Sequence, residues 1–371
     1  MQMILPESSQ IKVGALSQVF SDMSESYKIF WLKSIIDLLA QGSQQLSFSD
    51  IINRMMFNAW YMVSEFHLNL GPSDSLEKIV LYAQNISKLE PCAKEKEILN
   101  FLENTDDRTI LKAKRTLSVF VPYRLLAPFM PDVRGKFWDN TGNVINRVNS
   151  DSDILYHFDK LDGLNRHIIV QDRWVAYLSN NLAIVQGWID YNLIQYLQRR
   201  NPTVPGIASK LSAPVERELT KAKQFWKAIV DVAPVANIYI ESHEQLTKED
   251  ISLDHFVPWS FCAHDELWNL VPTTKSINSS KSNNLPNWDA FFPQLCDVEY
   301  QSYELIWSNN HVNKAFQQAR KQHVNSPDAE VRLYQPGITQ EVFSENLHDI
   351  ILPSYQAARN IGYMEWGGYD K

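Results

Sequence analysis

Hydrophobic residues recur at helical spacing through most of the first 200 positions of the chain. In residues 26–39 the apolar positions are Ile29, Leu32, Ile36 and Leu39. Residues three or four apart share one face of a helix, so this segment is predicted to be an amphipathic helix. The segments 51–70, 76–86 and 93–102 are also expected to be helices.

Sequence signals predict both ends of the helix over residues 51–70. Ser47 and Asp50 have the spacing of a capping box, with Asp in place of the usual Glu. Gly71 and Pro72 predict where this helix stops. Residues 173–200 carry a broad apolar face and are expected to form one further helix.

Prolines interrupt the helical pattern twice. Pro122, Pro128 and Pro131 exclude a single regular helix over residues 119–139. The segment 201–214 holds three prolines and Gly206, and it is the clearest linker in the chain. Residues 215–230 then predict another helix.

The pattern changes after residue 234. Two short runs rich in β-branched and aromatic residues, 235–240 and 251–257, predict two strands separated by the polar stretch 241–250. Helices are expected again over residues 299–307 and 311–323. The predicted fold is therefore mainly α with a small α+β module. The predicted segments are a helical N-terminal domain (1–200), a linker and connecting helix (201–234), the module (235–290) and a helical C-terminal region (291–371).

Composition narrows the class of protein. The chain has 371 residues, of which 44% are hydrophobic, and eleven are Trp, which favours a well-packed protein over a disordered one. No run of about 20 nearly uncharged residues predicts a membrane span, and the N-terminus lacks the pattern of a secretion signal. Cys92, Cys262 and Cys296 are far apart, so neither a disulfide framework nor a structural zinc site is expected, and a reducing, cytoplasmic setting fits best.

The residues that suggest chemistry lie within a span of about 30 positions. Asp254 and His255 are adjacent, Asn269 follows His255 by 14 residues, and Asn278 follows Asn269 by nine. This arrangement resembles the HNH endonuclease family, in which two antiparallel strands and a helix surround one divalent metal ion. Pro258, and the Leu-Val-Pro sequence after Asn269, also match the family pattern.

The resemblance implies a role for each residue. His255 would be the general base that deprotonates water, since imidazole titrates near neutral pH. Asp254 and Asn278 would hold the metal ion, and Asn269 would tie the neighbouring loop to backbone beside His255. Lys281 lies three residues after Asn278 on the same helix face, and it is expected to contact a phosphate.

The ligand set indicates which metal the site would take. Many family members place a His at the third position and another His four residues later, where this chain has Asn278 and Ser282. One carboxylate, one amide and water ligands suit Mg²⁺ or Mn²⁺ better than Zn²⁺. In this respect the segment resembles the HNH domain of CRISPR RNA-guided nucleases more than that of colicins.

The net charge of −8 counts against a broad basic surface for nucleic acid. Contacts with phosphate must therefore come from local clusters of Lys and Arg. Arg199, Arg200 and Lys210 flank the linker and are the predicted nucleic-acid contacts. The expected activity is cleavage of nucleic acid, DNA rather than RNA. The setting we predict is the effector of a prokaryotic anti-phage defence system that acts beside an ATPase or sensor protein.

Two alternatives stay open at this point. A stand-alone restriction-like enzyme would cut specific sequences by itself. A non-catalytic nucleic-acid-binding or scaffold protein would keep the HNH fold only for its shape. The presence of Asp254, His255 and Asn278 together argues against the non-catalytic alternative. A protein that kept the fold only for its shape would not need the residues that bind the metal ion and activate water.

Overall fold

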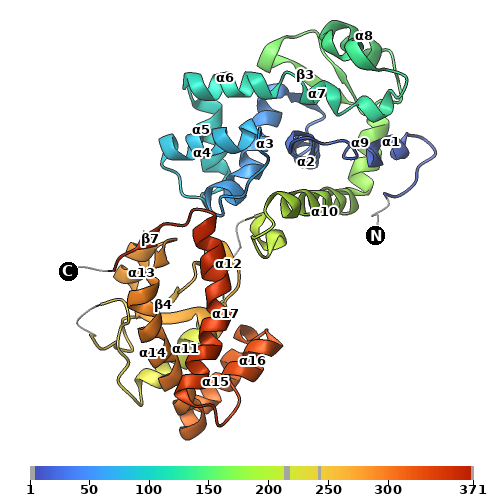
Figure 1. Ribbon diagram of the computed structural model, residues 1–371. Coiled ribbons are helices and arrows are strands. Elements are labelled where there is room, and N and C mark those ends of the chain that lie inside the picture. The colour runs from blue at the N-terminus through green and yellow to red at the C-terminus, as the bar shows by residue number, and fades with distance from the viewer. Residues whose placement is uncertain (1–4, 213–217, 241–243, 369–371) are drawn as a thin grey trace. The chain divides into compact units, whose positions relative to one another are not determined.

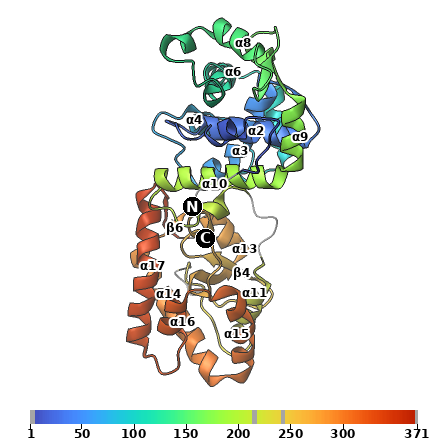
Figure 2. The same cartoon turned by 90° about the vertical axis from the view of Figure 1, so that its right-hand side faces the viewer.

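The computed structural model describes residues 5–212, 218–240 and 244–368, and the chain forms two compact units (Figures 1 and 2). Unit 1 comprises Met1–Pro202 and Ile207–Ala213, and unit 2 comprises Thr203–Gly206 and Pro214–Lys371. Helices dominate both units and the sheets are small, which confirms the predicted fold class. No helix among the described residues is long and apolar enough to cross a membrane.

Unit 1 is built mainly from helices. They are α1 (Val13–Ser17), α2 (Tyr27–Ala40), α3 (Phe48–Ser64), α4 (Ser75–Ser87), α5 (Glu95–Asn104), α6 (Arg108–Leu117), α7 (Val121–Arg124), α8 (Thr141–Asn149), α9 (Asp172–Asn180) and α10 (Leu182–Arg200). Short 3₁₀ helices add to them: η1 (Ala127–Phe129), η2 (Gly135–Asp139), η3 (Gly163–Asn165) and η4 (Ile207–Lys210).

The helix ends in unit 1 follow local chemistry. Helix α3 begins where the capping signal predicts, because Ser47 Oγ accepts a hydrogen bond from the backbone N–H of Asp50 at 3.0 Å. It ends at Ser64 rather than residue 70, and His67 beyond it takes a left-handed φ of 51°. The expected single helix over residues 173–200 is two helices, α9 and α10, separated at Asn181.

A three-stranded antiparallel sheet in unit 1 was not predicted. Its order is β1 (Gln45–Ser47), β3 (His167–Val170) and β2 (Tyr156–Phe158). Strands of three or four residues are too short to show a periodic pattern in the sequence, and β1 pairs with a segment more than a hundred residues away.

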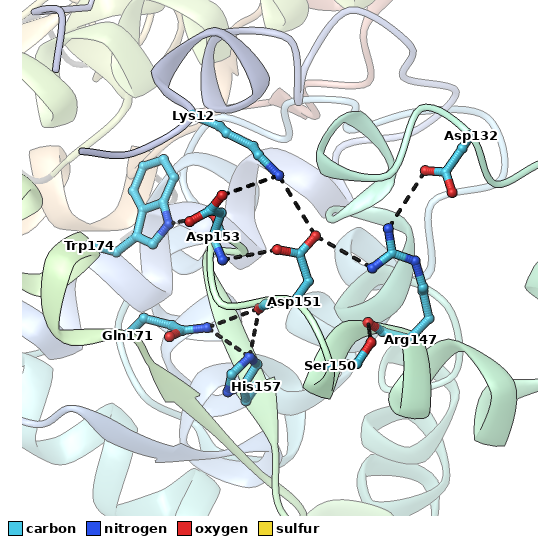
Figure 3. A network of polar contacts seen from close by, with 9 residues as sticks. All are labelled: Lys12, Asp132, Arg147, Ser150, Asp151, Asp153, His157, Gln171 and Trp174. Atoms are coloured by element: carbon cyan, nitrogen blue, oxygen red, sulfur yellow. Dashed lines mark hydrogen bonds and ion pairs between the residues drawn. The ribbon is translucent and has the colours of Figure 1, made fainter. Parts of the chain in front are cut away.

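A polar network beside this sheet ties the N-terminal segment to α8 and β2 (Figure 3). Lys12 Nζ lies 3.7 Å from the carboxylates of both Asp151 and Asp153. Arg147 Nη1 lies 3.5 Å from Asp151, and the backbone carbonyl of Asp151 is 2.9 Å from Nε2 of His157. Lys12 and Arg147 already neutralise these carboxylates. The network therefore holds these segments together and does not offer free ligands.

Unit 2 surrounds a two-stranded ribbon with helices. The ribbon strands are β4 (Ile251–His255) and β5 (Leu270–Thr274), preceded by η5 (Leu267–Asn269), and a parallel pair joins β6 (Leu285–Pro286) to β7 (Glu365–Trp366). The helices are α11 (Thr220–Val230), α12 (Trp259–Cys262), α13 (Lys275–Lys281), α14 (Trp288–Ser308), α15 (Asn310–His323), α16 (Pro327–Leu333) and α17 (Gln340–Asn360). Residues 215–217 of the predicted helix over 215–230 lie outside the described residues.

One hydrophobic core joins the ribbon to the helices on both sides of it in sequence. The core includes Trp226 of α11, Val271 of β5 and Leu347 of α17. Trp226 Nε1 also donates a hydrogen bond to the carbonyl of Leu270 at 3.1 Å. The structure therefore groups residues 214–371 together, whereas the sequence predicted separate connecting, module and C-terminal segments.

The predicted strand over residues 235–240 is corrected. Within the described residues this stretch makes only an isolated bridge between Ala236 and Gln245. Asn237 Oδ1 accepts hydrogen bonds from the backbone N–H of Tyr239 and from Thr273 Oγ1, both at 3.2 Å, so the chain turns instead of extending. The partner of β4 is β5, which contains Pro272 and tolerates it because β5 has only one neighbouring strand.

Candidate active site

The end of β4 and one face of α13 bring the predicted site residues together. Asp254 and His255 are consecutive at the end of β4, so their side chains leave opposite faces of the strand. On α13, Asn278 Nδ2 donates to the carbonyl of Leu253 at 2.8 Å. Lys281 Nζ donates to the carbonyl of His255 at 2.8 Å. Helix α13 is therefore bound along the backbone of the strand that carries Asp254 and His255.

The carboxylate of Asp254 is buried and uses one of its oxygens for two partners. Oδ2 accepts a hydrogen bond from the hydroxyl of Tyr239 at 2.8 Å and pairs with Lys281 Nζ at 2.9 Å. Burial and the neighbouring Asp254 raise the pKa of Tyr239 well above its usual value, so the phenol keeps its proton and donates. Tyr239 was not predicted, because a tyrosine in an apolar run has the pattern of a core residue.

The position of Lys281 corrects its predicted role. The side chain is fully buried, and its ammonium group donates inward to Asp254 and to the backbone of His255. An exposed lysine was needed for the expected phosphate contact. Lys281 is instead the counter-ion of the buried carboxylate, which would be costly to bury without a partner.

His255 is held by a residue that the sequence did not indicate. Its Nε2 lies 2.8 Å from Oδ1 of Asp265, in the loop between α12 and η5. A carboxylate can only accept a hydrogen bond, so Nε2 carries a proton, and in the neutral ring Nδ1 then has the lone pair. The ring therefore presents an acceptor atom in a fixed orientation. Asp265 follows His255 by ten residues and lies in a loop. A loop has no periodic pattern from which the sequence could predict that Asp265 contacts His255.

Asn269 ties this loop to the chain that follows His255. It is fully buried, its Oδ1 accepts from the backbone N–H of Val257 at 2.8 Å, and its Nδ2 donates to the carbonyl of Val257 at 2.9 Å. The backbone N–H of Phe256 also donates to the carbonyl of Asn269 at 2.9 Å. These bonds fix the path of the backbone immediately after His255.

Three acceptor atoms of the site have no hydrogen-bond partner within the described residues. They are Oδ1 of Asp254, Nδ1 of His255 and Oδ1 of Asn278. The amide orientation of Asn278 is settled by its bond to the Leu253 carbonyl, because only the NH₂ group can donate there.

Two of these acceptors, Oδ1 of Asp254 and Oδ1 of Asn278, fit a hard cation. No group of three or more His, Cys, Asp or Glu side chains arranged for a metal ion is found among residues 5–212, 218–240 and 244–368. A cation at this site would therefore bind one carboxylate oxygen of Asp254, one amide oxygen of Asn278 and several water molecules. Mg²⁺ accepts such a set because it keeps much of its hydration shell in proteins.

The predicted nucleic-acid contacts lie in unit 1, whereas every residue described above lies in unit 2. Lys210 is fully buried with its Nζ 4.7 Å from the centre of the Phe66 ring, which corrects its prediction as a surface contact. Arg200 is half-buried, and its guanidinium donates to the carbonyl of Ser24. Arg199 is exposed.

One of the comparisons with known proteins agrees with this geometry. No curated protein and no solved structure matches the chain. Residues 239–287 match the family model described as HNH endonuclease, and this segment contains β4, β5 and α13 together with Tyr239, Asp265 and Asn269. Residues 239–287 are thus an HNH endonuclease module.

Proposed function

We propose that this chain is a metal-dependent endonuclease that hydrolyses phosphodiester bonds in nucleic acid, with His255 as its general base. The single observation that carries the proposal is the pair of Asp265 and His255, in which Nε2 faces the carboxylate, so that in the neutral ring Nδ1 is the acceptor, with no partner among the described residues. An oriented acceptor of this kind is what the deprotonation of an attacking water requires.

The proton transfer can be assigned to named atoms. Nδ1 of His255 takes a proton from water as the water oxygen attacks phosphorus, and the bond from phosphorus to the leaving oxygen breaks. The ring then carries two protons, and the carboxylate of Asp265 at 2.8 Å stabilises that positive charge. Products with a 5′-phosphate follow from the family resemblance.

Asp254 and Asn278 are the residues that we propose hold the metal ion, which is Mg²⁺ or Mn²⁺. Their free oxygens, Oδ1 in both residues, are the available ligands. A bound divalent ion would stabilise the charge that develops on the phosphate and on the leaving oxygen. Tyr239 and Lys281 hold the other oxygen of Asp254, so the carboxylate cannot rotate freely.

The test is incubation of the full chain with supercoiled plasmid and Mg²⁺, Mn²⁺ or EDTA. Nicking that needs the metal is expected, and the His255→Ala variant should cut at least about 100-fold more slowly with an unchanged circular dichroism spectrum. A His255→Ala variant that cuts as fast as the parent would show that another group is the base. A parallel assay with single-stranded RNA tests the proposed preference for DNA.

Target selection is proposed to depend on residues outside the module, because a ribbon-and-helix site contacts mainly the nucleic-acid backbone. Unit 1 contributes none of the site residues, which is the observation that favours an effector dependent on a partner. An anti-phage defence system with an ATPase or sensor is the setting that we propose. An effector should cut slowly or indiscriminately by itself, whereas a restriction-like enzyme should cut the plasmid at discrete sequences.

A further inference from the structure

The loop that carries Asp265 is held by residues outside the family match. Nδ1 of His323, the last residue of α15, lies 2.8 Å from the backbone carbonyl of Asp265. Asn325 donates to the carboxylate of Glu266 with both its backbone N–H at 2.9 Å and its side-chain NH₂ at 2.8 Å. Two consecutive loop residues are thus bound from the junction between α15 and α16.

Burial strengthens the hydrogen bond of His323, and charge strengthens those of Glu266. His323 is 2% exposed and Glu266 is 6% exposed, so water has little access to these two side chains, whereas Asn325 is exposed. A carbonyl only accepts, which means that Nδ1 of His323 carries its proton. Glu266 is a carboxylate that accepts two hydrogen bonds from one residue, and bonds to charged acceptors are stronger than neutral ones.

The loop also makes hydrogen bonds of its own. Cys262 Sγ donates to the carbonyl of His264 at 3.7 Å, and the backbone N–H of Glu266 lies 3.4 Å from Nδ1 of His264. Ala263, at the start of the loop, has a left-handed φ of 53°, a conformation that is unfavourable for a residue with a Cβ. The hydrogen bonds from His323 and Asn325 add to those that hold this backbone in one conformation.

We propose that His323 and Asn325 are positioning residues, which hold the loop so that the Asp265 carboxylate stays against Nε2 of His255. The inference rests on the proposed function, in which the proton on Nε2 leaves Nδ1 free to act as the base. It assigns a catalytic task to the junction of α15 and α16, which lies beyond residue 287, where the family match ends.

The experiment measures the tautomer of His255 in the full chain without added metal. Long-range ¹H–¹⁵N correlation spectra of the imidazole-labelled protein distinguish a protonated from an unprotonated ring nitrogen. The variants are His323→Leu and Asn325→Ala, with Asp265→Ala as the reference for a lost carboxylate. The matched control is Asn309→Ala, which removes the cap at the other end of α15, where Asn309 Oδ1 accepts from two backbone N–H groups.

In the parent, His255 is expected as a single tautomer with the proton on Nε2. His323→Leu and Asn325→Ala should add the second tautomer, as Asp265→Ala does, and should lower the cleavage rate about tenfold or more. Asn309→Ala should destabilise α15 but leave both the tautomer and the rate as in the parent.

The proposal is overturned if His323→Leu and Asn325→Ala keep the parent tautomer while Asp265→Ala loses it. It is also overturned if Asn309→Ala changes the tautomer as much as they do, because general loosening of α15 would then explain the effect. Failure of the nuclease proposal looks different: the parent would not cut nucleic acid, yet the tautomer spectra would still decide whether the junction positions Asp265.

Discussion

Asp254 and Lys281 form a buried ion pair whose energetics constrain the site. The ammonium group has its Nζ 2.9 Å from Oδ2 of Asp254, and both side chains are almost completely removed from water. Moving two charges out of water is expensive, and the pair is tolerated because each charge compensates the other and further hydrogen bonds satisfy them. Tyr239 and the carbonyl of His255 supply those further bonds.

The Lys281→Met variant tests this pairing. It should lower the free energy of unfolding by about 3–5 kcal/mol in EDTA, because it leaves an uncompensated buried carboxylate. Excess Mn²⁺ should restore part of the loss, since a cation that binds only the folded state adds stability. Urea unfolding with EDTA or Mn²⁺ measures both effects. The control is Lys275→Met, which changes an exposed lysine of the same helix. Equal losses in EDTA and in Mn²⁺ would count against a cation at Asp254.

Helix α14 contains a buried acid that the site does not use. Glu299 is 2% exposed, and its Oε1 has no hydrogen-bond partner among the described residues. Burial raises the pKa of Glu299 well above its usual value, so the side chain keeps its proton to a higher pH in the folded protein than in the unfolded chain. The folded state therefore binds a proton that the unfolded chain releases above pH 4.5, the ordinary pKa of the group.

This difference gives a sign to the pH dependence of stability. A raised pKa in the folded state contributes stability at low pH that is lost as the pH rises from 4.5 toward the raised value. Glu299→Gln should therefore be more stable than the parent at about pH 8, with a smaller difference at about pH 5. Urea unfolding at the two pH values measures this. Glu304→Gln, an exposed change on the same helix, should show no such trend.

At the scale of the whole molecule, each unit has a core of its own. Unit 2 contains every residue of the site, including the junction of α15 and α16 that holds the Asp265 loop. The core of unit 1 includes Trp60, which is fully buried in α3. Separate cores are the basis for separate cooperative transitions.

Calorimetric unfolding of the full chain should therefore show two transitions. Lys281→Met and Mn²⁺ should shift only one of them, because both act at Asp254 in unit 2. Trp60→Ala, which removes a large core side chain at a cost of about 3–5 kcal/mol, should shift only the other. A single transition that moves with all three changes would mean that the units unfold together.

The sequence alone determined where the module lies and which residues form its motif. Asp254, His255, Asn269 and Asn278 lie within about 30 residues, and a ribbon followed by a helix brings positions at such spacings together by local geometry. Apolar periodicity likewise predicted α2, α4 and α15, because the face that a helix buries is repeated along its own sequence.

The tertiary structure decided which partners these residues have. Some residues could be recognised as part of the site only from hydrogen bonds between segments that the fold brings together. They are Tyr239, Asp265, His323 and Asn325. The tertiary structure also decided the direction of the Lys281 side chain. The sequence shows that residue 281 is a lysine, but not whether its ammonium group contacts a phosphate or, as here, a buried carboxylate. Contacts of this kind depend on packing between elements, and packing leaves no periodic signal in the sequence.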